Sequence, residues 1–234
     1  RDAYNLIRQE NPFPSICGRV CTHPCESKCR RAQIDDPIAI ADLKRYAADF
    51  VYNSGEPLVT LSFPKNGSSV GIIGAGPSGL TCGYYLSRLG YTVDIYEEKD
   101  VAGGILAYGI PEYRLPKEEL KKEIDAIVQS GINIIYNTKV GKDITFSELK
   151  EKYNAIYIST GTQLSRKIGI EGEEKGGVYH GLDFLRDISM NKKVKVKGIV
   201  AVIGGGNTAI DAARSALRLG AKEVHILYRR TMEE

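Results

Sequence analysis

A strand, a glycine-rich turn and a helix start follow one another between Val70 and Glu97, and this stretch constrains the fold more than any other. Its apolar opening is typical of a buried strand, and the turn places Gly74, Gly76 and Gly79 at the G-x-G-x-x-G spacing. The first glycine permits a tight turn, the second lets a pyrophosphate approach the backbone, and the third allows close helix–strand packing. We therefore expect a dinucleotide site whose phosphates face the helix N-terminus.

The second strand of this stretch ends at Glu97, 23 residues after Gly74. An acidic side chain at that point is placed to accept hydrogen bonds from an adenosine ribose. A six-residue glycine pattern alone is weak evidence of a nucleotide, but a preceding strand, a following helix and the glutamate favour a nucleotide site over a structural loop. The expected phosphate loop consists of Gly74, Ala75, Gly76, Pro77, Ser78 and Gly79.

A second strand–turn–helix begins at Ile199. Its turn is Gly204-Gly205-Gly206-Asn207-Thr208, and Ala209 takes the third-glycine position, a common substitution. The following strand ends in Arg229 and Arg230 instead of an acid. Arginine suits a 2′-phosphate and favours NADP over NAD, although paired arginines at a strand end often merely face solvent. Two strands and one helix are too little to bury a stable sheet alone, so we expect Gly198 to Glu234 to pack against the preceding domain or a neighbouring chain, or to belong to a longer polypeptide.

Four of the five cysteines fall within 13 residues, at Cys17, Cys21, Cys25 and Cys29, where Gly18 and Pro24 are expected to interrupt any continuous helix. In a reducing compartment such a cluster favours metal binding over disulfides. Zinc sites usually pair two C-x2-4-C units across a longer loop, whereas iron–sulfur clusters accept varied spacings. The redox motifs downstream favour iron–sulfur. Zinc, with or without His23, and four buried unliganded cysteines are the alternatives.

Between these motifs the chain alternates strand and helix, as a parallel, doubly wound α/β sheet requires. We expect helices at 2–10, 35–52, 117–130 and 146–152, strands at 132–136 and 155–159, and a linker at 53–69. The apolar face of the helix at 35–52 is expected to consist of Ile38, Ile40, Leu43, Ala47 and Phe50. Glycines and prolines predict an irregular functional loop at 103–116, and alternating lysine and valine at 193–197 predict a solvated edge strand.

The composition indicates a globular protein, with 42% hydrophobic and 26% charged residues. A net charge of +3 is too slight to indicate a nucleic-acid partner. The sequence contains neither a run of membrane-spanning length nor a signal-peptide pattern, so we expect no membrane span and a cytoplasmic location. It starts at Arg1 and ends directly after a strand-like run, which suggests a fragment of something longer.

Five motifs in this order resemble the small subunit of glutamate synthase and its relatives: NPFPSICGRVCTHPCESKC, GIIGAGPSGL, GGILAYGIPEYRLPK, STGTQLSRKIGIEGE and VIGGGNTAIDAAR. These relatives include the flavin and iron–sulfur end of dihydropyrimidine dehydrogenase and the NADPH-binding subunit of the bifurcating transhydrogenase. The resemblance implies a two-dinucleotide-binding (Rossmann-like) flavoprotein fold preceded by a small helical iron–sulfur domain. The implied parts are an iron–sulfur domain at 1–60, the N-terminal part of an FAD-binding domain at 61–197, and the start of an NAD(P)H-binding domain at 198–234.

The resemblance also assigns cofactors to residues. The first glycine loop and Glu97 would bind the ADP half of FAD, and the second loop with Arg229 and Arg230 would bind NADP or NAD. Gly104, Leu106 and Arg114 would line the flavin side, Val140 would face the adenine, and Thr160 and Gly161 would touch the cofactor again. Cys21, Cys25 and Cys29 would ligate [4Fe–4S] clusters, while Cys17 would stay unliganded.

We therefore predict an oxidoreductase module that moves electrons between NAD(P)H, FAD and [4Fe–4S] clusters and serves a larger catalytic subunit or a fused electron-transfer domain. The cofactors carry this chemistry, so we expect no catalytic acid or base from the protein. One alternative is a relative of the pyridine-nucleotide disulfide reductases, which would need a redox-active cysteine pair, whereas Cys82 stands alone. The other is a zinc-stabilised docking module that binds nucleotide without turnover.

Overall fold

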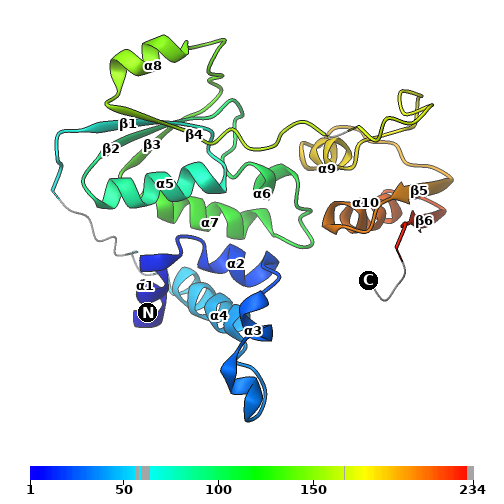
Figure 1. Cartoon of the computed structure of the whole chain (residues 1–234), viewed down its shortest axis with the longest axis horizontal. Coiled ribbons are helices and arrows are strands. Elements are labelled where there is room, and N and C mark those ends of the chain that lie inside the picture. Colours follow the sequence, from blue (N-terminus) through cyan, green and yellow to red (C-terminus); the bar gives the residue numbers. More distant parts are fainter. Residues whose placement is uncertain (56–57, 59–63, 166, 231–234) are drawn as a thin grey trace. The chain divides into compact units, whose positions relative to one another are not determined.

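The computed structural model describes residues 1–55, 58, 64–165 and 167–230. It divides into two compact units (Figure 1). The first contains Arg1–Gly104 and Arg114–Gly161, and the second contains Ile105–Tyr113 and Thr162–Glu234. Within the described residues, no helix is both long and apolar enough to cross a membrane.

The first unit is built on a four-stranded sheet in the order β3-β2-β1-β4, with every pair parallel. The strands are β1 (Ser69–Ile73), β2 (Thr92–Tyr96), β3 (Ile132–Ile135) and β4 (Ala155–Ile158). Both β3 and β4 end one residue earlier than predicted. The parallel sheet with alternating helices confirms the predicted fold class.

Helices cover both faces of this sheet. Figure 1 shows α5 (Pro77–Arg88) and α7 (Lys117–Val128) on one face and α8 (Phe146–Lys152) on the other. Alternate strand residues point to opposite faces, so Ile72 and Ile95 lie under Gly83 of α5, while Tyr96 packs with Leu149 of α8. The central strands β1 and β2 are therefore buried, as strands of parallel sheets usually are, whereas the edge strand β4 is mostly exposed.

The N-terminal residues of this unit form short helices: α1 (Asp2–Glu10), α2 (Pro14–Val20), α3 (Pro24–Ser27), the 3-10 helix η1 (Arg30–Gln33) and α4 (Ile40–Asn53). Pro24 begins a helix, as proline at a first helical position does. The expectation that Gly18 interrupts the helix was wrong. Gly18 lies inside α2, where an added Cβ would come within 2.6 Å of Arg45 Cβ, so its role is to let α2 and α4 approach closely.

Helix α4 differs from its prediction in two ways. It begins at Ile40 instead of Asp35, because Pro37 lacks an N–H and restricts the residue before it. The prediction of its apolar face was also wrong, since Leu43 and Phe50 are each 58% exposed while Ala41, Ala48 and Val51 are buried. Close approach of the helices selects small side chains for the buried face and leaves the large ones outside. The predicted linker at 53–69 overlaps α4 at Asn53 and β1 at Ser69, and its residues 56–57 and 59–63 lie outside the described residues.

One buried carboxylate joins the N-terminal helices to the sheet-covering helix α7. Glu123 is 0% exposed, and its two oxygens accept from the backbone N–H groups of Ser15 at 2.6 Å and Ile16 at 2.8 Å. These N–H groups belong to the first turn of α2, which has no partners for them inside the helix. The same contact region includes Arg8, which donates to the carbonyl of Ala126 at 3.3 Å.

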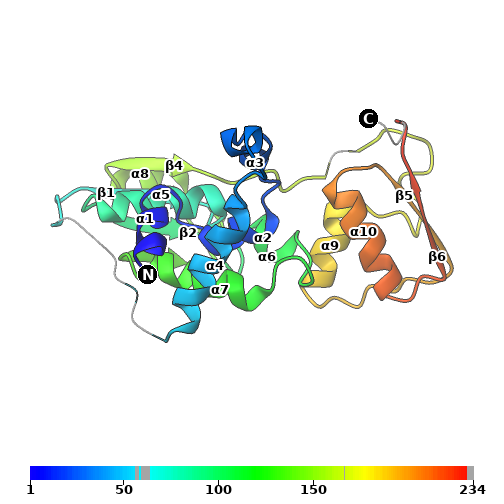
Figure 2. The ribbon, with the colours of Figure 1, turned by 90° about the horizontal axis from the view of Figure 1, so that it is seen from below.

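The second unit contains a two-stranded parallel sheet, β5 (Ile199–Ile203) and β6 (Glu223–Leu227). Its helices are α6 (Ile105–Tyr108), α9 (Gly181–Ser189) and α10 (Asn207–Arg218). Figure 2 shows α9 and α10 side by side. Phe184 and Leu185 of α9 bury Ala212 and Ala216 of α10, so the segment from Ile199 packs against preceding residues, as expected.

Two expectations for this region were wrong. The alternating segment at 193–197 is not a strand, because Val194 and Val196 pack against the core of α9 and α10 instead of joining a ladder. The alternation of lysine and valine therefore indicated an extended segment with one buried side. Such a segment does not need to pair with another strand. The loop at 103–116 is not wholly irregular either, since it includes the helical turn α6.

Candidate functional site

The first glycine loop joins β1 to α5, and each of its glycines has a separate steric reason. Gly74 has a φ of +101°, a left-handed value, and an added Cβ would lie 2.5 Å from the Ser159 carbonyl oxygen. At Gly79 an added Cβ would lie 2.0 Å from the Gly74 carbonyl oxygen. Around Gly76, by contrast, no atom of the described residues lies within 4 Å of an added Cβ. The loop thus leaves open the glycine at which the sequence predicts pyrophosphate approach.

Glu97 lies directly beside this loop, at the carboxyl end of β2. It is 7% exposed, its Oε2 accepts from the Ala75 N–H at 2.9 Å and its Oε1 accepts from the Lys99 N–H at 3.0 Å. These two bonds fix the carboxylate and leave each oxygen with further acceptor capacity. The geometry suits a group that holds the loop and still receives a ribose hydroxyl. The ribose contact itself stays a prediction.

Other residues assigned to FAD gather around the same loop. The Gly103 N–H donates to the Ala75 carbonyl at 2.8 Å, and an added Cβ on Gly104 would lie 3.1 Å from Gly76 Cα. Thr160 and Gly161 follow Ser159, whose Oγ donates to the Gly74 carbonyl at 3.0 Å. The structure therefore places Gly104 and Thr160 beside the phosphate loop.

The remaining FAD assignments lie further from the glycines. Val140 belongs to a turn that is tied to the end of β2, since the Thr138 N–H donates to the Glu97 carbonyl at 2.9 Å. Arg114 is half-buried and precedes α7, in the first unit. Leu106 is half-buried in α6, which belongs to the second unit. Their predicted contacts with the cofactor stay predictions.

The second glycine loop joins β5 to α10 in the other unit. Gly204 has a φ of +128°, and its N–H donates to the Leu227 carbonyl at 2.9 Å. An added Cβ on Gly204 would lie 3.5 Å from the Ala209 Cβ, an ordinary contact, so the first glycine of this loop is less crowded than Gly74. Arg229 and Arg230 follow β6 and are exposed.

The four clustered cysteines lie on separate short elements of the N-terminal region. Cys17 is in α2, Cys21 follows α2, Cys25 is in α3 and Cys29 precedes η1. All four are free, and no three cysteine, histidine, aspartate or glutamate side chains within the described ranges are gathered in a metal-binding arrangement. His23 pairs through Nδ1 with Glu26 Oε2 at 3.1 Å.

The surroundings of the sulfur atoms differ in a way that bears on metal ligation. Backbone N–H groups, first that of Ile38, lower the pKa of Cys29, and Cys21 Sγ accepts from the His23 N–H at 3.3 Å. Burial instead raises the pKa of Cys17, whose Sγ donates to Asn11 Oδ1 at 3.8 Å. Thiolates are the metal-binding form, so Cys21 and Cys29 have donor surroundings that fit a cluster and Cys17 does not.

Two residues with specific contacts were missed from the sequence. Glu123 stands on the apolar side of α7 with Leu120 and Ile127, and a lone acid in such a stripe is the signal that was available. Tyr228 stands at the end of β6, and an added Cβ on Gly205 would lie 2.8 Å from its ring carbons. Only strand pairing reveals that position.

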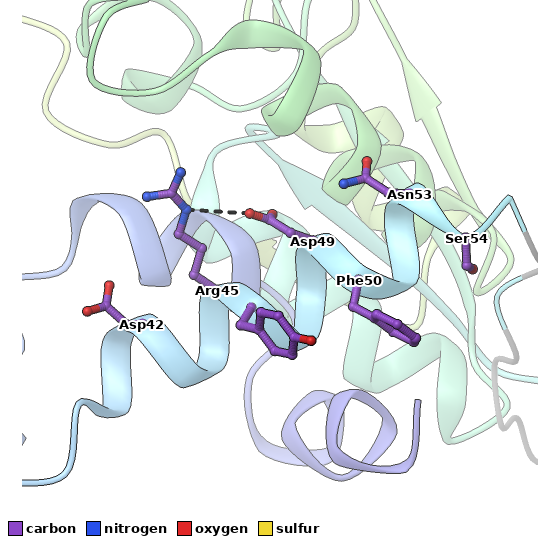
Figure 3. A pocket seen from close by; sticks show the side chains of 7 residues that line it. Asp42, Arg45, Asp49, Phe50, Asn53 and Ser54 are labelled. Atoms are coloured by element: carbon purple, nitrogen blue, oxygen red, sulfur yellow. Dashed lines mark hydrogen bonds and ion pairs between the residues drawn. The ribbon is translucent and has the colours of Figure 1, made fainter.

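A pocket on α4 is lined by no residue of either glycine loop. Figure 3 shows its wall, formed by Asp42, Arg45, Tyr46, Asp49, Phe50, Asn53 and Ser54. Arg45 Nε and Asp49 Oδ2 are 3.4 Å apart across it. None of the predicted cofactor residues lines this pocket, so it is not the dinucleotide site.

Comparison with known families gives two matches. Residues 68–232 match the family profile described as pyridine nucleotide-disulphide oxidoreductase. Residues 1–56 match the profile described as dihydropyrimidine dehydrogenase domain II, 4Fe-4S cluster. Together these two matches take in nearly the whole chain, and they divide it between the cysteine-rich helices and the two glycine loops.

Individual proteins are also similar. The chain is 45% identical over 240 residues to the NADPH-Fe(3+) oxidoreductase subunit beta of Geobacter sulfurreducens, covering 100% of this chain and 35% of that protein. It is 37% identical over 235 residues to the glutamate synthase [NADPH] small chain of Bacillus subtilis, covering 96% of this chain and 48% of that protein. The chain therefore spans about a third to a half of the length of these relatives.

A solved structure supports the fold. FprA of Mycobacterium tuberculosis in complex with NADPH has a TM-score of 0.60 and 24% sequence identity, covering 72% of this chain and 44% of that one. At that identity the likeness shows the fold alone. It agrees with the parallel sheet and the strand–turn–helix units described above.

Proposed function

Because this chain belongs to the pyridine nucleotide-disulphide oxidoreductase family, we propose that its first glycine loop holds FAD and its second holds NADPH. The family matches confirm the predicted resemblance to the glutamate synthase small subunit and its relatives. They also confirm an oxidoreductase module with FAD, a nicotinamide dinucleotide and a [4Fe–4S] cluster as its cofactors. Which residues hold each cofactor, and the division into domains at 1–60, 61–197 and 198–234, are parts of the proposal.

The observation that carries the FAD assignment is the pairing of the first loop with Glu97. The open face at Gly76 and the N-terminus of α5 offer backbone N–H groups to a pyrophosphate, while the buried carboxylate holds the Ala75 N–H. Gly104 and Thr160 border the same loop. Bound FAD supplies the capacity to take up hydride and release single electrons.

The NADPH assignment rests on the charge at the end of β6. Arg229 and Arg230 are exposed there, and a guanidinium makes paired, charge-assisted hydrogen bonds to a phosphate. If these contacts contribute about 1.5–3 kcal/mol, NADPH should be preferred to NADH roughly ten- to a hundred-fold.

The test is to measure kcat/KM for both nucleotides in the full-length wild type and in the variant Arg229→Ala/Arg230→Ala. The variant should lose most of the preference while NADH use stays nearly intact. A wild type that already prefers NADH would show that these arginines serve the surface instead of the cofactor. A matched control is Arg218→Ala, because Arg218 lies in the last turn of α10 and stacks on Tyr113.

For the cluster we propose Cys21, Cys25 and Cys29 as ligands. The N–H donors around Cys21 and Cys29 support this, as does the raised pKa of Cys17. Replacing any of the three with Ser should lower iron and labile sulfide in the purified full-length protein, whereas Cys17→Ser should retain them. Stoichiometric zinc without sulfide would favour the zinc-stabilised docking module instead.

The alternative chemistry of disulfide reduction needs a redox-active cysteine pair near the flavin. Cys82 lies half-buried in α5, and burial raises the pKa of its thiol, which makes it a poor nucleophile. A visible spectrum with flavin bands and a broad shoulder near roughly 400 nm would support the iron–sulfur flavoprotein instead.

The terminal electron acceptor is not identified by the residues of this chain. The chain spans about a third to a half of its relatives, so we propose that a larger catalytic subunit or a fused domain takes the electrons. A cytoplasmic location stays a prediction. Purification of the full-length protein with the subunits that accompany it would identify the acceptor.

A further inference from the structure

The two glycine loops make the same backbone hydrogen bond to the strand that follows them in the sequence. The Gly74 N–H donates to the Tyr96 carbonyl at 2.8 Å, and the Gly204 N–H donates to the Leu227 carbonyl at 2.9 Å. The strand registers agree, since Ile73 pairs with Tyr96 and Ile203 pairs with Leu227. The residues that come next, Glu97 and Tyr228, therefore occupy equivalent positions at the ends of their strands.

The side chains at these two positions do different things to equivalent loop residues. Glu97 accepts the N–H of Ala75, the second residue of its loop, at 2.9 Å. Tyr228 instead lays its ring against Gly205, where an added Cβ would lie 2.8 Å from Cδ2 and Cε2. An ordinary Cβ contact exceeds that distance by several tenths of an ångström, so the ring and a side chain on residue 205 exclude each other.

We infer that Tyr228 is a specificity-determining residue of the second loop. Its ring occupies the place from which a carboxylate would accept a free ribose 2′-hydroxyl, so NADH loses the acceptor that it would need there. Because tyrosine stands where the first loop has a glutamate, this strand end carries no negative charge. A 2′-phosphate can therefore approach Arg229 and Arg230 without repulsion. This inference rests on the proposed function, because it presumes that a nicotinamide dinucleotide binds at this loop.

A purely structural role for Tyr228 predicts a different outcome. The side chain is 49% exposed, so replacing it removes little buried apolar area and should change the stability of the unit only slightly. A ring that merely packs on the loop would affect both nucleotides alike. The discriminating measurement is therefore the ratio of the two nucleotides and not the affinity for either one.

The first variant pair is Tyr228→Glu and Tyr228→Phe in the full-length holoenzyme. Tyr228→Glu should lower the NADPH-to-NADH ratio of kcat/KM at least ten-fold, mostly by loss of NADPH, whereas Tyr228→Phe should leave the ratio within about two-fold. The dissociation constants of 2′,5′-ADP and 5′-AMP provide a readout independent of turnover. In Tyr228→Glu they should show the same loss of affinity for 2′,5′-ADP and a gain of affinity for 5′-AMP, because the new carboxylate accepts the free hydroxyl.

A double variant tests the exclusion directly, because Gly205→Ala combined with Tyr228→Glu recreates the Ala75–Glu97 pair of the first loop. Gly205→Ala alone should weaken binding of both probes by displacing the ring. In the Tyr228→Glu variant, adding Gly205→Ala should not weaken the binding of either probe, because no ring is there to be displaced. Equal losses in both backgrounds would overturn the steric part of the inference.

The outcomes separate this inference from the function on which it rests. A wild type that binds 2′,5′-ADP no better than 5′-AMP would overturn the nucleotide assignment, and with it the role of Tyr228. A wild type that prefers 2′,5′-ADP together with a Tyr228→Glu variant of unchanged ratio would overturn the inference alone. If Tyr228→Glu does not fold, Tyr228→Gln replaces it, and it should raise the affinity for 5′-AMP because its amide oxygen accepts the free hydroxyl.

Discussion

The two strand–turn–helix motifs have matching backbones but different surroundings. In the first, β1 lies between β2 and β4, and its three central residues are buried. In the second, β5 pairs with β6 in a two-stranded sheet, and no residue of β5 is fully buried.

Crowding around the first loop makes its glycines strict. The carbonyls of Ser159 and Gly74 stand where side chains at Gly74 and Gly79 would go. The first glycine of the second loop is less crowded, because the nearest described atom to an added Cβ on Gly204 is the Ala209 Cβ, at an ordinary 3.5 Å. A glycine motif therefore specifies a backbone path, whereas the atoms packed around the loop decide how strictly each glycine is required.

The largest expected effect comes from adding one methyl group to the crowded loop. Gly79→Ala would put a Cβ 2.0 Å from a backbone carbonyl that cannot move without moving β1. We expect the free energy of unfolding of the first unit to fall by about 3 kcal/mol or more. Urea unfolding of the FAD-free protein measures it, and there Gly76→Ala, which meets open space among the described residues, should cost about 1 kcal/mol or less. An unchanged midpoint for Gly79→Ala would show that α5 shifts freely.

A pH titration should also separate the two units. Burial raises the pKa of Glu123 to about 7, against the opposing N–H groups of Ser15 and Ile16 and the charge of Arg8. Between about pH 5 and 7 the folded protein therefore keeps a proton that the unfolded chain has lost. The free energy of unfolding of the first unit should fall as pH rises through that window, by at most about 3 kcal/mol.

Hydrogen exchange followed separately in β1–β4 and in β5–β6 measures this pH dependence. Glu123→Gln should flatten it, since an amide cannot ionise, while the second unit should respond little in either protein. A first unit equally stable at pH 5 and pH 8 would contradict the raised pKa. A pH dependence that is unchanged in Glu123→Gln would also contradict it.

An intermediate effect is expected for the carboxylate that distinguishes the first loop. Glu97→Ala leaves the Ala75 N–H without its acceptor and removes the expected ribose partner, so FAD retention should weaken by roughly 1–3 kcal/mol. Flavin released on dilution of the full-length protein gives the dissociation constant. Glu98→Ala is a matched control, because Glu98 pairs with Lys99 and Lys139 at the surface. An FAD affinity that does not change in Glu97→Ala would remove this residue from the site.

The smallest effect should come from making the second loop resemble the first. Ala209→Gly places a glycine in the first turn of α10, so we expect the free energy of unfolding to fall by about 1 kcal/mol or less. NADPH binding should stay within about two-fold, which isothermal titration of 2′,5′-ADP would check. A loss comparable to that of Gly79→Ala would mean that the second loop is as crowded as the first.

Much of the fold could be predicted from the sequence because it rests on local signals. The glycine loops, the alternation of strands and helices, and the helix at Phe146–Lys152 depend on spacing and capping within a few residues. The buried face of α4 could not be predicted in this way. The large residues Ile40, Leu43 and Phe50 stand at helical spacing and were expected to be buried, whereas Ala41 and Ala48 are the buried ones. Burial was decided by how closely α2 approaches at Gly18.

Local sequence patterns were enough to predict two glycine loops, an acid at the end of the strand that follows the first and arginines after the strand that follows the second. The equivalence of Tyr228 to Glu97, and the hydrogen bonds by which Glu123 joins α7 to the first turn of α2, could be seen only in the folded chain. The physical reason is range. A turn or a cap is specified by residues that are neighbours in the chain, whereas strand register and a buried hydrogen bond between residues 108 positions apart exist only once the chain has folded.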